Sequence, residues 1–473
     1  MDTKKLRQKI LDLAIRGKLV PQDPNDEPAS VLLERIRAEK EQLIKEGKIK
    51  RSKKSAASDT SHYENVPFEV PENWEWIKLG ECGDVITGMT PSKDNKLYYG
   101  GKIPFYKPTD LEQGEYTLYS SDTLSTLGFS QCRQLPCNSI LVTCIGATIG
   151  KTGIIKSRGA CNQQINAIVP YCFLNYQYLY YVCVSNYMQT EIRDNSSSTT
   201  LPILNKSKFS ELMIPLPPLN EQFRIIRAVK DILLEIENLD RERHNLRNQI
   251  HNIKNLVIEL AISGKLVPHK PLDEPVTELL RRINPNYTPC DNRHYENIPF
   301  DLPETWLWVT LSDISNYGEC NNVPVSRIPE DSWILELEDI EKDSGCLIQR
   351  RKKSDRNING VRHSFQKGDV LYSKLRTYLN KVLVADQDGY CTTEIIPITC
   401  VQGIVPEYLC HVLRSKYYVD YTSSLGYGVK MPRLGTADAL RLMIPVPPYE
   451  EQERISEKIT QIFECLDKIT AEL

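Results

Sequence analysis

The sequence predicts a mixed α/β fold in which two globular α/β domains are separated by two long antiparallel helices, related by an approximate twofold axis with a circularly split repeat. Three observations predict this fold. Several sequence blocks occur twice in the same order, and short β-type runs lie between them. Each half ends with apolar residues spaced three to four apart, as in a helix that packs against another. Repeated blocks that frame unlike inserts indicate one scaffold used twice.

The duplication is carried by four pairs of matched blocks. The first pair reads LAIRGKLVPQDPNDEP and LAISGKLVPHKPLDEP, at 13–28 and 260–275. The others are HYENVPFEVPENWEW and HYENIPFDLPETWLW at 62–76 and 294–308, MIPLPPLNEQFRI and MIPVPPYEEQERI at 213–225 and 443–455, and a weaker pair at 139–155 and 369–385. The first half carries an excess around 38–54, a basic helix-then-linker stretch. We interpret it as a solvated helix, with a phosphate-binding arm as the alternative.

The spacing of apolar residues indicates a repeated helical scaffold whose second copy is divided between the two ends of the chain. Residues 219–262 are expected to form one helix, with a proline pair before it and Gly264 as its stop. In the second copy the apolar spacing of three to four residues runs from 455 to Leu473, and Leu6, Ile10 and Leu13 continue it from the other terminus. We therefore expect the two ends of the chain to lie close together and the helices to pack antiparallel. The alternative is two unrelated helices, each packed on its own domain.

Each insert shows short β-type runs followed by an amphipathic stretch. The runs are 140–146 and 151–155 in the first half, and 369–373 and 381–385 in the second. A helix is expected at 175–187 and at 406–418. The expected divisions are an N-terminal helical segment completing the C-terminal helix (1–60), a first recognition domain (61–216), a central helical spacer (217–290), a second recognition domain (291–446) and a C-terminal helix (447–473).

Composition restricts the class of protein. A length of 473 residues suggests two to four domains. The net charge of −3 means that any surface for nucleic acid must be locally basic. The 14 cysteines are irregularly spaced without a CxxC pair, which favours free thiols in a reducing cytoplasm. No apolar run reaches the ~20 residues that span a bilayer, so we expect no membrane partner.

Motifs for catalysis are expected to be absent. GATIGKT (146–152) resembles a phosphate-binding loop but is one residue short, and its counterpart RTYLNKV (376–382) has no glycine, so we predict a β-turn followed by a basic residue. ELEDIEK (336–342) has carboxylates like those of a metal-dependent nuclease. Its counterpart PTDLEQG (108–114) shares few of them, so a strand end and a turn are predicted instead. No catalytic residue and no metal ligand is assigned.

Basic and polar side chains at expected loop positions are candidates for contact with DNA. Lysine and arginine bind phosphates, and amide, carboxylate and guanidinium groups read base edges. Each such residue, taken singly, is more often a solvated surface group. The candidates are Lys107, Thr109, Lys151, Gln163, Gln164, Asn166 and Lys206 in the first half, and Arg350, Arg351, Lys374, Arg376, Lys381, Thr393, Glu394, Lys430 and Arg433 in the second.

The order of these blocks resembles one known family along essentially the whole chain. GKLVP…DEP, HYENxPFxxPExW and PxPPxxEQ, each present twice, are similar to the specificity subunits of type I restriction-modification enzymes. The resemblance implies two target-recognition domains, each for one half of an asymmetric, interrupted site in double-stranded DNA. It implies that the helices act as a spacer and dock two methyltransferase (modification) subunits and two restriction (motor-nuclease) subunits. S-adenosylmethionine, ATP and Mg²⁺ would be bound by those partners and not by this chain.

Two other functions stay open at this point. One is a protein-binding scaffold without DNA specificity, which the acidic net charge favours. The other is an enzyme with an unrecognised site.

Overall fold

The computed structural model describes residues 2–49, 66–197, 201–285, 300–428 and 430–473. The described chain divides into two compact units, Met1–Glu242 and Arg243–Leu473, and the division falls inside helix α8 (Leu219–Ile262). This 44-residue helix confirms the one expected from the sequence. The repeated HYEN residues, the end of the basic stretch at 50–54 and the expected boundaries at 61 and 291 lie outside the described residues. No helix of the described chain is long and apolar enough to cross a membrane.

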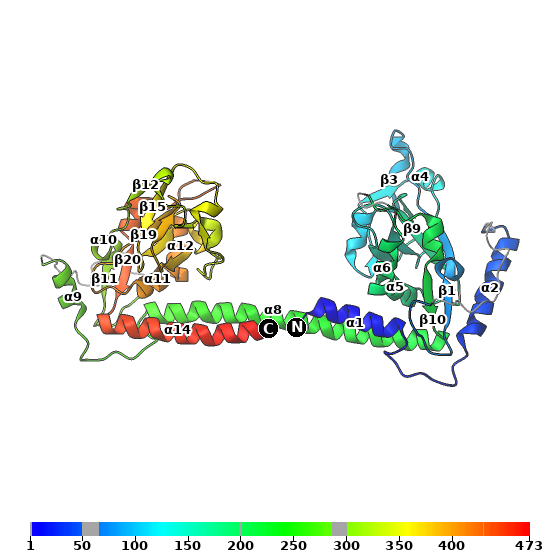
Figure 1. Ribbon diagram of the computed structural model, residues 1–473, viewed down its shortest axis with the longest axis horizontal. Helices are drawn as coiled ribbons and strands as arrows, with labels where there is room; N and C mark the ends of the chain where they lie inside the picture. Colours follow the sequence, from blue (N-terminus) through cyan, green and yellow to red (C-terminus); the bar gives the residue numbers. More distant parts are fainter. Residues whose placement is uncertain (1, 50–65, 198–200, 286–299, 429) are drawn as a thin grey trace. The chain divides into compact units, whose positions relative to one another are not determined.

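The first unit holds the α/β domain of the first half (Figure 1). Its sheets have the strand orders β2-β9-β6-β7-β4, β5-β3-β8 and β1-β10. Its strands are β1 (Glu75–Lys78), β2 (Gly83–Thr87), β3 (Tyr99–Tyr106), β4 (Tyr116–Thr117), β5 (Asp122–Leu124), β6 (Ile140–Thr143), β7 (Thr152–Ile155), β8 (Ala160–Cys161), β9 (Ile165–Pro170) and β10 (Met213–Leu216). Its helices are α1 (Thr3–Ile15), α2 (Ala29–Lys45), α3 (Leu79–Cys82), α4 (Thr126–Ser130), α5 (Tyr176–Val184), α6 (Asn186–Asp194) and α7 (Lys206–Glu211), with 3-10 turns η1 (Lys96–Tyr98) and η2 (Pro108–Gln113).

The second unit holds the second domain, whose sheets have the orders β12-β15-β18-β13-β14, β17-β16-β19 and β11-β20. Its strands are β11 (Leu307–Thr310), β12 (Asn322–Pro324), β13 (Trp333–Leu335), β14 (Arg351–Lys352), β15 (Val361–Phe365), β16 (Val370–Ser373), β17 (Val382–Val384), β18 (Gly389–Cys391), β19 (Ile395–Ile398) and β20 (Met443–Val446). Its helices are α9 (Val276–Ile283), α10 (Leu311–Ile314), α11 (Pro406–Arg414), α12 (Lys416–Ser424), α13 (Thr436–Leu440) and α14 (Tyr449–Glu472), with 3-10 turns η4 (Val325–Arg327), η5 (Leu337–Asp339), η6 (Lys353–Asp355) and η7 (Thr377–Leu379).

The helix expected after the β-type runs is broken into two in both domains. Ser185 separates α5 from α6, and Ser415 separates α11 from α12. Each serine has an extended backbone (ψ 151° and 149°), and its hydroxyl accepts a hydrogen bond from the third residue of the next helix. A serine that caps a new helix ends the preceding one. The prediction of one continuous helix at 175–187 and at 406–418 was therefore wrong.

Each domain enters and leaves through a two-stranded antiparallel ribbon. In the first unit β1 pairs with β10, with Trp76 opposite Pro215. In the second unit β11 pairs with β20, with Trp308 opposite Pro445. These strands come from the repeated tryptophan block and the repeated PxPP block. The two blocks therefore form one structural element, which brings both ends of each insert to the same place.

The Glu-Gln pair after each PxPP block ties the helix to the domain. Gln222 accepts from the backbone N–H of Asn175 at 3.0 Å and donates to the carbonyl of Pro217 at 3.0 Å. Gln452 accepts from Val405 N–H at 2.9 Å and donates to Pro447 at 3.0 Å. The same bonds recur because both copies of the block begin a helix at the same point.

The glutamate of that pair is a buried carboxylate in both copies. Glu221 accepts from the Trp74 indole at 2.9 Å and from the Gln22 amide. Glu451 lies 2.7 Å from the imidazole of His269, which stands at the position of Gln22. Burial raises the pKa of both carboxyls. The GKLVP loop, the ribbon and the connecting helix therefore meet at one buried acid.

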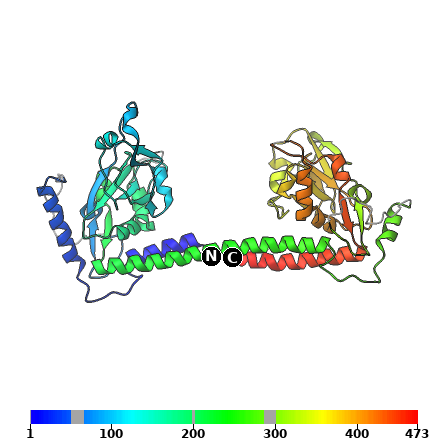
Figure 2. The ribbon, with the colours of Figure 1, turned by 180° about the vertical axis from the view of Figure 1, so that it is seen from behind.

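The helices of each unit form an antiparallel pair (Figures 1 and 2). Arg7 of α1 forms ion pairs with Glu237 (3.5 Å) and Asp240 (3.4 Å) of α8. In the second unit Lys254 of α8 pairs with Asp467 of α14 at 2.5 Å. The antiparallel packing expected from the seams is confirmed within each unit. That the two chain ends lie together stays a prediction.

Helix α2 accounts for the first part of the excess in the first half. The Glu39 carboxylate accepts from the backbone N–H of Cys172 at 2.9 and 3.2 Å, and the Lys40 ammonium donates to the Gly80 carbonyl at 2.9 Å. These contacts hold α2 against the α/β domain. The interpretation of this part as a merely solvated helix was therefore wrong for Glu39 and Lys40.

Gly17 of the GKLVP block is a position that only glycine fits. It ends α1 with a φ of +67°, and a Cβ there would lie 2.4 Å from Cγ of Pro71. Gly47 ends α2 with a φ of +71°, but a Cβ there would meet no atom within 4 Å. We expect Gly17→Ala to cost the left-handed strain of about 1 kcal/mol and a further ~1–3 kcal/mol for overpacking. Gly47→Ala, the matched control, should cost the strain alone. Thermal unfolding compares them, and equal losses would contradict the contact.

Glu221→Gln tests the raised pKa of the buried carboxyl. An unfolded glutamate ionises near pH ~4.3, whereas the folded one ionises only at its raised pKa. The contribution of Glu221 to the free energy of unfolding therefore falls as the pH rises between these two values and is constant above them. The amide cannot ionise and still accepts from Trp74. The difference in melting temperature, variant minus wild type, should rise across this window. Glu235→Gln, on the exposed face of α8, is the control. A difference that does not change with pH would rule out the effect.

Candidate nucleic-acid interface

Three loops meet at the same place in each domain, and we call them the three-loop face. In the first domain they are 144–150, 162–164, and 195–197 together with 201–205. The Cys144 N–H donates to the Gln164 carbonyl at 2.8 Å, the Leu204 N–H donates to the Cys144 carbonyl at 2.8 Å, and the Gly146 N–H donates to Pro202 at 3.0 Å. These backbone bonds fix where the side chains of the three loops stand.

The second domain repeats this framework with different residues, in loops 374–380, 392–394, and 425–428 together with 430–435. The Lys374 N–H donates to the Glu394 carbonyl at 3.0 Å, the Leu434 N–H donates to Lys374 at 2.9 Å, and the Arg376 N–H donates to Pro432 at 2.7 Å. The two three-loop faces therefore share a backbone and differ in chemistry.

The turn that opens the face is left-handed in both domains. Gly146 and Gly150 have φ values of 101° and 89°, and their counterparts Arg376 and Asn380 have φ values of 51° and 48°. The segment 146–150 is a turn directly before Lys151, so the prediction of a β-turn followed by a basic residue is confirmed. A left-handed arginine is strained, and its place in a functional loop is typical of such strain.

The amide candidates of the first domain differ in exposure. Gln163 is exposed and accepts from the Thr90 hydroxyl, and half-buried Gln164 accepts from the Asn162 amide at 2.9 Å. Asn166 is buried in β9, where it accepts from Thr87 at 2.7 Å and donates to the Leu204 carbonyl at 3.4 Å. Asn166 therefore lies beneath the three-loop face and holds one of its loops through Leu204. Its burial argues against contact with a base.

The lysines of the first domain fall into two groups. Lys206 begins α7 beside the three-loop face and is exposed. Lys107, Thr109 and Lys151 instead gather around η2, where Lys107 forms an ion pair with Asp122 and Lys151 with Glu112. Thr109 is exposed. Of the candidates in the first domain, the two glutamines therefore lie on the three-loop face and Lys206 lies directly beside it.

In the second domain the face collects most of the candidates. Thr393 and Lys430 are exposed, and Lys374 and Arg376 are half-buried. Arg433 donates to Glu394 through Nε at 3.0 and 3.1 Å and through Nη2 at 2.8 Å. The hydrogen bond and charge of Arg433 hold the pKa of the Glu394 carboxyl below its usual range. Lys381 lies apart, and its ammonium donates to the Leu337 carbonyl at 2.6 Å.

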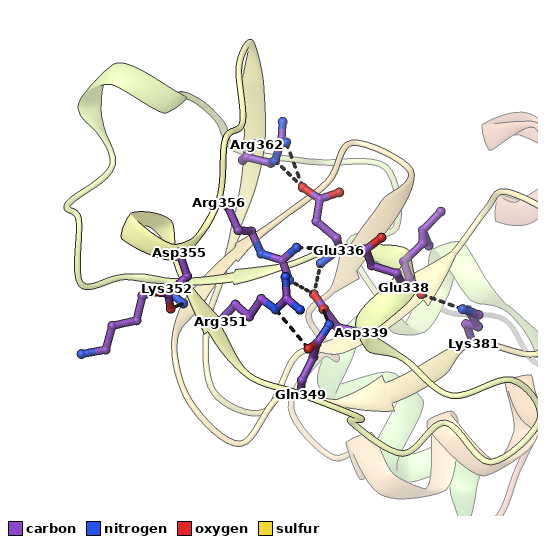
Figure 3. A network of polar contacts seen from close by, with 11 residues as sticks. Glu336, Glu338, Asp339, Gln349, Arg351, Lys352, Asp355, Arg356, Arg362 and Lys381 are labelled. Carbon is purple, nitrogen blue, oxygen red and sulfur yellow. Dashed lines mark hydrogen bonds and ion pairs between the residues drawn. The ribbon is translucent and has the colours of Figure 1, made fainter. Parts of the chain in front are cut away.

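The acidic stretch 336–342 has a structural role. It directly follows the end of β13 at Leu335 and contains the turn η5, so the predicted turn is confirmed. Asp339 is fully buried, and its carboxylate accepts from Arg356, from Gln349 at 3.0 Å and from the Glu336 N–H at 2.8 Å (Figure 3). Arg362 pairs with Glu336 at 2.8 Å. The carboxylates of Glu336 and Asp339 are therefore neutralised by arginines of the same domain.

Arg350 and Arg351 of the basic run 349–356 are both exposed but differ in their partners. Arg350 donates twice to Asp386, at 2.6 and 2.8 Å, and its guanidinium stacks 4.4 Å from the ring centre of Trp333. Arg351 is exposed and bonds only to the nearby Gln349 side chain at 3.0 Å among the described residues. Both were predicted to bind DNA. The geometry leaves Arg351 available, while Arg350 is engaged with Asp386 and Trp333.

Exposed aromatic and apolar residues beside the second face were missed by the sequence reasoning. Tyr427 (62% exposed), Tyr378 (46%) and Met431 (49%) surround the loops that carry Arg433. The sequence signal for Tyr427 was the neighbouring Gly428, since glycine often marks a turn, and Gly428 has a φ of 103° in the structure. Large exposed side chains in polar loops are typical of binding surfaces.

Arg350→Ala and Arg351→Ala should separate stability from binding. Loss of the Asp386 contact and of the stacking on Trp333 should lower the unfolding free energy of the second domain by about 1 kcal/mol. Arg351→Ala should change it by less than about 0.5 kcal/mol and reduce the slope of log affinity for DNA against log salt by about 1. Thermal unfolding and salt titrations of binding measure these effects. An unchanged salt slope for Arg351→Ala would remove Arg351 from the interface.

Comparison with known proteins finds related sequences along nearly the whole chain. A family model described as "Type I restriction modification DNA specificity domain" matches residues 71–246 and 360–473. The type I restriction enzyme EcoAI specificity subunit of Escherichia coli is 30% identical over 98% of this chain and 90% of its own length, and the EcoEI specificity subunit of the same species is 28% identical over 99% and 90%.

Solved structures show the same fold. A chain from a study of complex assembly and conformational transition of the type I R-M system superposes with a TM-score of 0.60 at 16% identity, covering 86% of this chain and 94% of that one. The HsdS subunit from Thermoanaerobacter tengcongensis superposes with a TM-score of 0.50, over 86% and 93% of the two chains. From the matched family model and the near-complete alignment with EcoAI, the chain belongs to the family of type I restriction-modification DNA specificity proteins.

Proposed function

We propose that the chain is the DNA-reading subunit of a type I restriction-modification complex, and that each α/β domain reads one half of an asymmetric, bipartite site in double-stranded DNA. One observation carries the proposal. The same backbone framework presents amides (Gln163, Gln164) in the first domain and a carboxylate–guanidinium pair (Glu394, Arg433) in the second. Amide and guanidinium groups discriminate different bases. Two unlike readers on equivalent frames imply two unlike half-sites.

The contacts with DNA are proposed residue by residue. Gln163, Gln164 and Lys206 act from the first face, and Arg351, Lys374, Arg376, Thr393, Glu394, Lys430 and Arg433 from the second domain. Lys107, Thr109, Lys151 and Lys381 stay weaker proposals because three of them are internally paired. Phosphate contacts by the lysines supply affinity, and base contacts supply specificity.

The helices are proposed as a spacer and a docking scaffold. Within each unit an antiparallel helix pair is tied to its α/β domain by a buried glutamate and a glutamine. Equivalent surfaces on a duplicated frame suit two copies of the same partner. We propose two methyltransferase subunits and two restriction subunits as partners, working in the cytoplasm where the chromosome is.

No catalytic step is assigned to this chain. The carboxylates that come nearest to a nuclease motif, Glu336 and Asp339, are held by Arg362 and Arg356. In our proposal S-adenosylmethionine, ATP and Mg²⁺ belong to the partner subunits. A base to be methylated must leave the duplex, and this chain would set the register in which the partners extrude it.

Exchange of residues 77–212 for the insert of another family member tests the proposal. Both junctions lie in or directly beside the β1–β10 ribbon, so the frame is retained. In the complex with the methyltransferase, we expect the methylated sequence to change in one half-site only. Methylation sequencing of host DNA measures this. A change in both halves would contradict modular reading. Binding without sequence preference by the wild-type complex would favour a protein-binding scaffold instead.

A further inference from the structure

Arg433 is fixed along one edge of its guanidinium and open along the other. Nε and Nη2 donate to the two oxygens of Glu394, in the side-on fork that arginine forms with a carboxylate. No other hydrogen bond of the Arg433 side chain occurs among the described residues, so the end-on edge, formed by Nη1 and Nη2, is unoccupied. The side chain is 39% exposed. The guanidinium is therefore partly exposed and held in a fixed orientation by Glu394.

The backbone around Arg433 is held from two sides. Its N–H donates to the Tyr427 carbonyl, and its carbonyl accepts from the Tyr427 N–H, both at 3.0 Å. On the other side Arg433 forms a β-bridge with Leu375. Lys374, which precedes Leu375, forms backbone hydrogen bonds with Glu394 and Leu434. Both members of the Arg433–Glu394 pair thus stand on a rigid support, which lowers the entropy lost when the pair meets a ligand.

We propose that Arg433 reads a guanine through its free edge in the major groove, and that Glu394 is a positioning residue that orients the guanidinium. This inference rests on the proposed function and names the base that one side chain reads. A guanidinium edge presents two parallel N–H donors, which match the O6 and N7 acceptors of guanine. Adenine has an amino donor in place of O6, so the same edge rejects it.

The surroundings suit a negatively charged ligand. Lys374 and Lys430 have no ion pair within the described chain, and Lys430 is exposed shortly before Arg433 in the sequence. We expect these two ammonium groups to bind phosphates that flank the base. The carboxylate of Glu394 would repel DNA if it were bare, but Arg433 neutralises it. The Arg433–Glu394 pair is then neutral, and the two lysines add positive charge from loops of the same face.

The first domain lacks this reader. The β-bridge that Arg433 forms with Leu375 is formed there by Ile203 with Ile145, and the position of Glu394 is taken by Gln164. Ile203 is 37% exposed and has no polar group in its side chain. The guanine contact is therefore expected in only one half-site, the one read by the second domain.

Arg433→Lys tests the proposal, because lysine keeps the charge and loses the fork. The full chain is purified with its methyltransferase partner, and the recognised sequence comes from methylation sequencing of host DNA. Binding is then measured by competition with duplexes that carry each single base-pair substitution across both half-sites. Arg433→Lys should reduce the discrimination at one G·C pair roughly 5- to 150-fold and leave every other position unchanged. Glu394→Gln should reduce it at the same pair by a smaller factor. Arg281→Lys is the control, since Arg281 pairs with Glu278 on α9.

Failure of the Arg433–guanine contact and failure of the proposed DNA-reading function would give different results. Loss of discrimination at an A·T pair, an equal loss at all positions, or an unchanged profile for Arg433→Lys would overturn the guanine contact. A Glu394→Gln profile equal to that of the wild type would overturn the positioning role. In each of these cases a wild-type complex that still prefers one sequence upholds the proposed function. A wild-type complex with no sequence preference would instead remove the proposed function itself.

Discussion

Each α/β domain depends on one constraint: both ends of its chain must return to the same antiparallel ribbon. The ribbon pairs Trp76 with Pro215 in the first unit and Trp308 with Pro445 in the second. Backbone hydrogen bonds set this register, so the residues between the strands can vary without moving the strands. The buried glutamate at the start of the following helix then fixes the ribbon to the GKLVP loop. Removing a partner from such a buried charge costs several kcal/mol in general, which accounts for the recurrence of the whole group in both halves.

The division of labour within each domain follows from this attachment. Apolar side chains of the strands and of the paired helices fill the core, and the loops of the three-loop face lie at the ends of β6 and β16. A face held by backbone hydrogen bonds can change its side chains at little cost in folding. Recognition can therefore differ between two domains that share one frame.

The frame was predictable from the sequence, and the detailed interface was predictable only in part. The repeated blocks predicted α8, the antiparallel seams and the strands β6, β7, β16 and β17, because each leaves a periodic or duplicated signal. Charge alone could not distinguish Arg350 from Arg351, because only the fold shows that Arg350 contacts Asp386 and Trp333. Asn166 was likewise indistinguishable from Gln164 until its burial was known. Pairings between distant residues, such as Arg433 with Glu394, leave no local pattern in a single sequence.

The left-handed backbone of Arg376 has a consequence for how the two domains balance stability against binding. The same turn in the first domain uses Gly146, which adopts a positive φ without strain. An arginine in this conformation costs on the order of 1–3 kcal/mol, and a glycine would relieve that cost but remove the cation. The second domain thus loses some stability at Arg376, where a charged group is useful. Functional surfaces commonly show this trade-off between stability and activity.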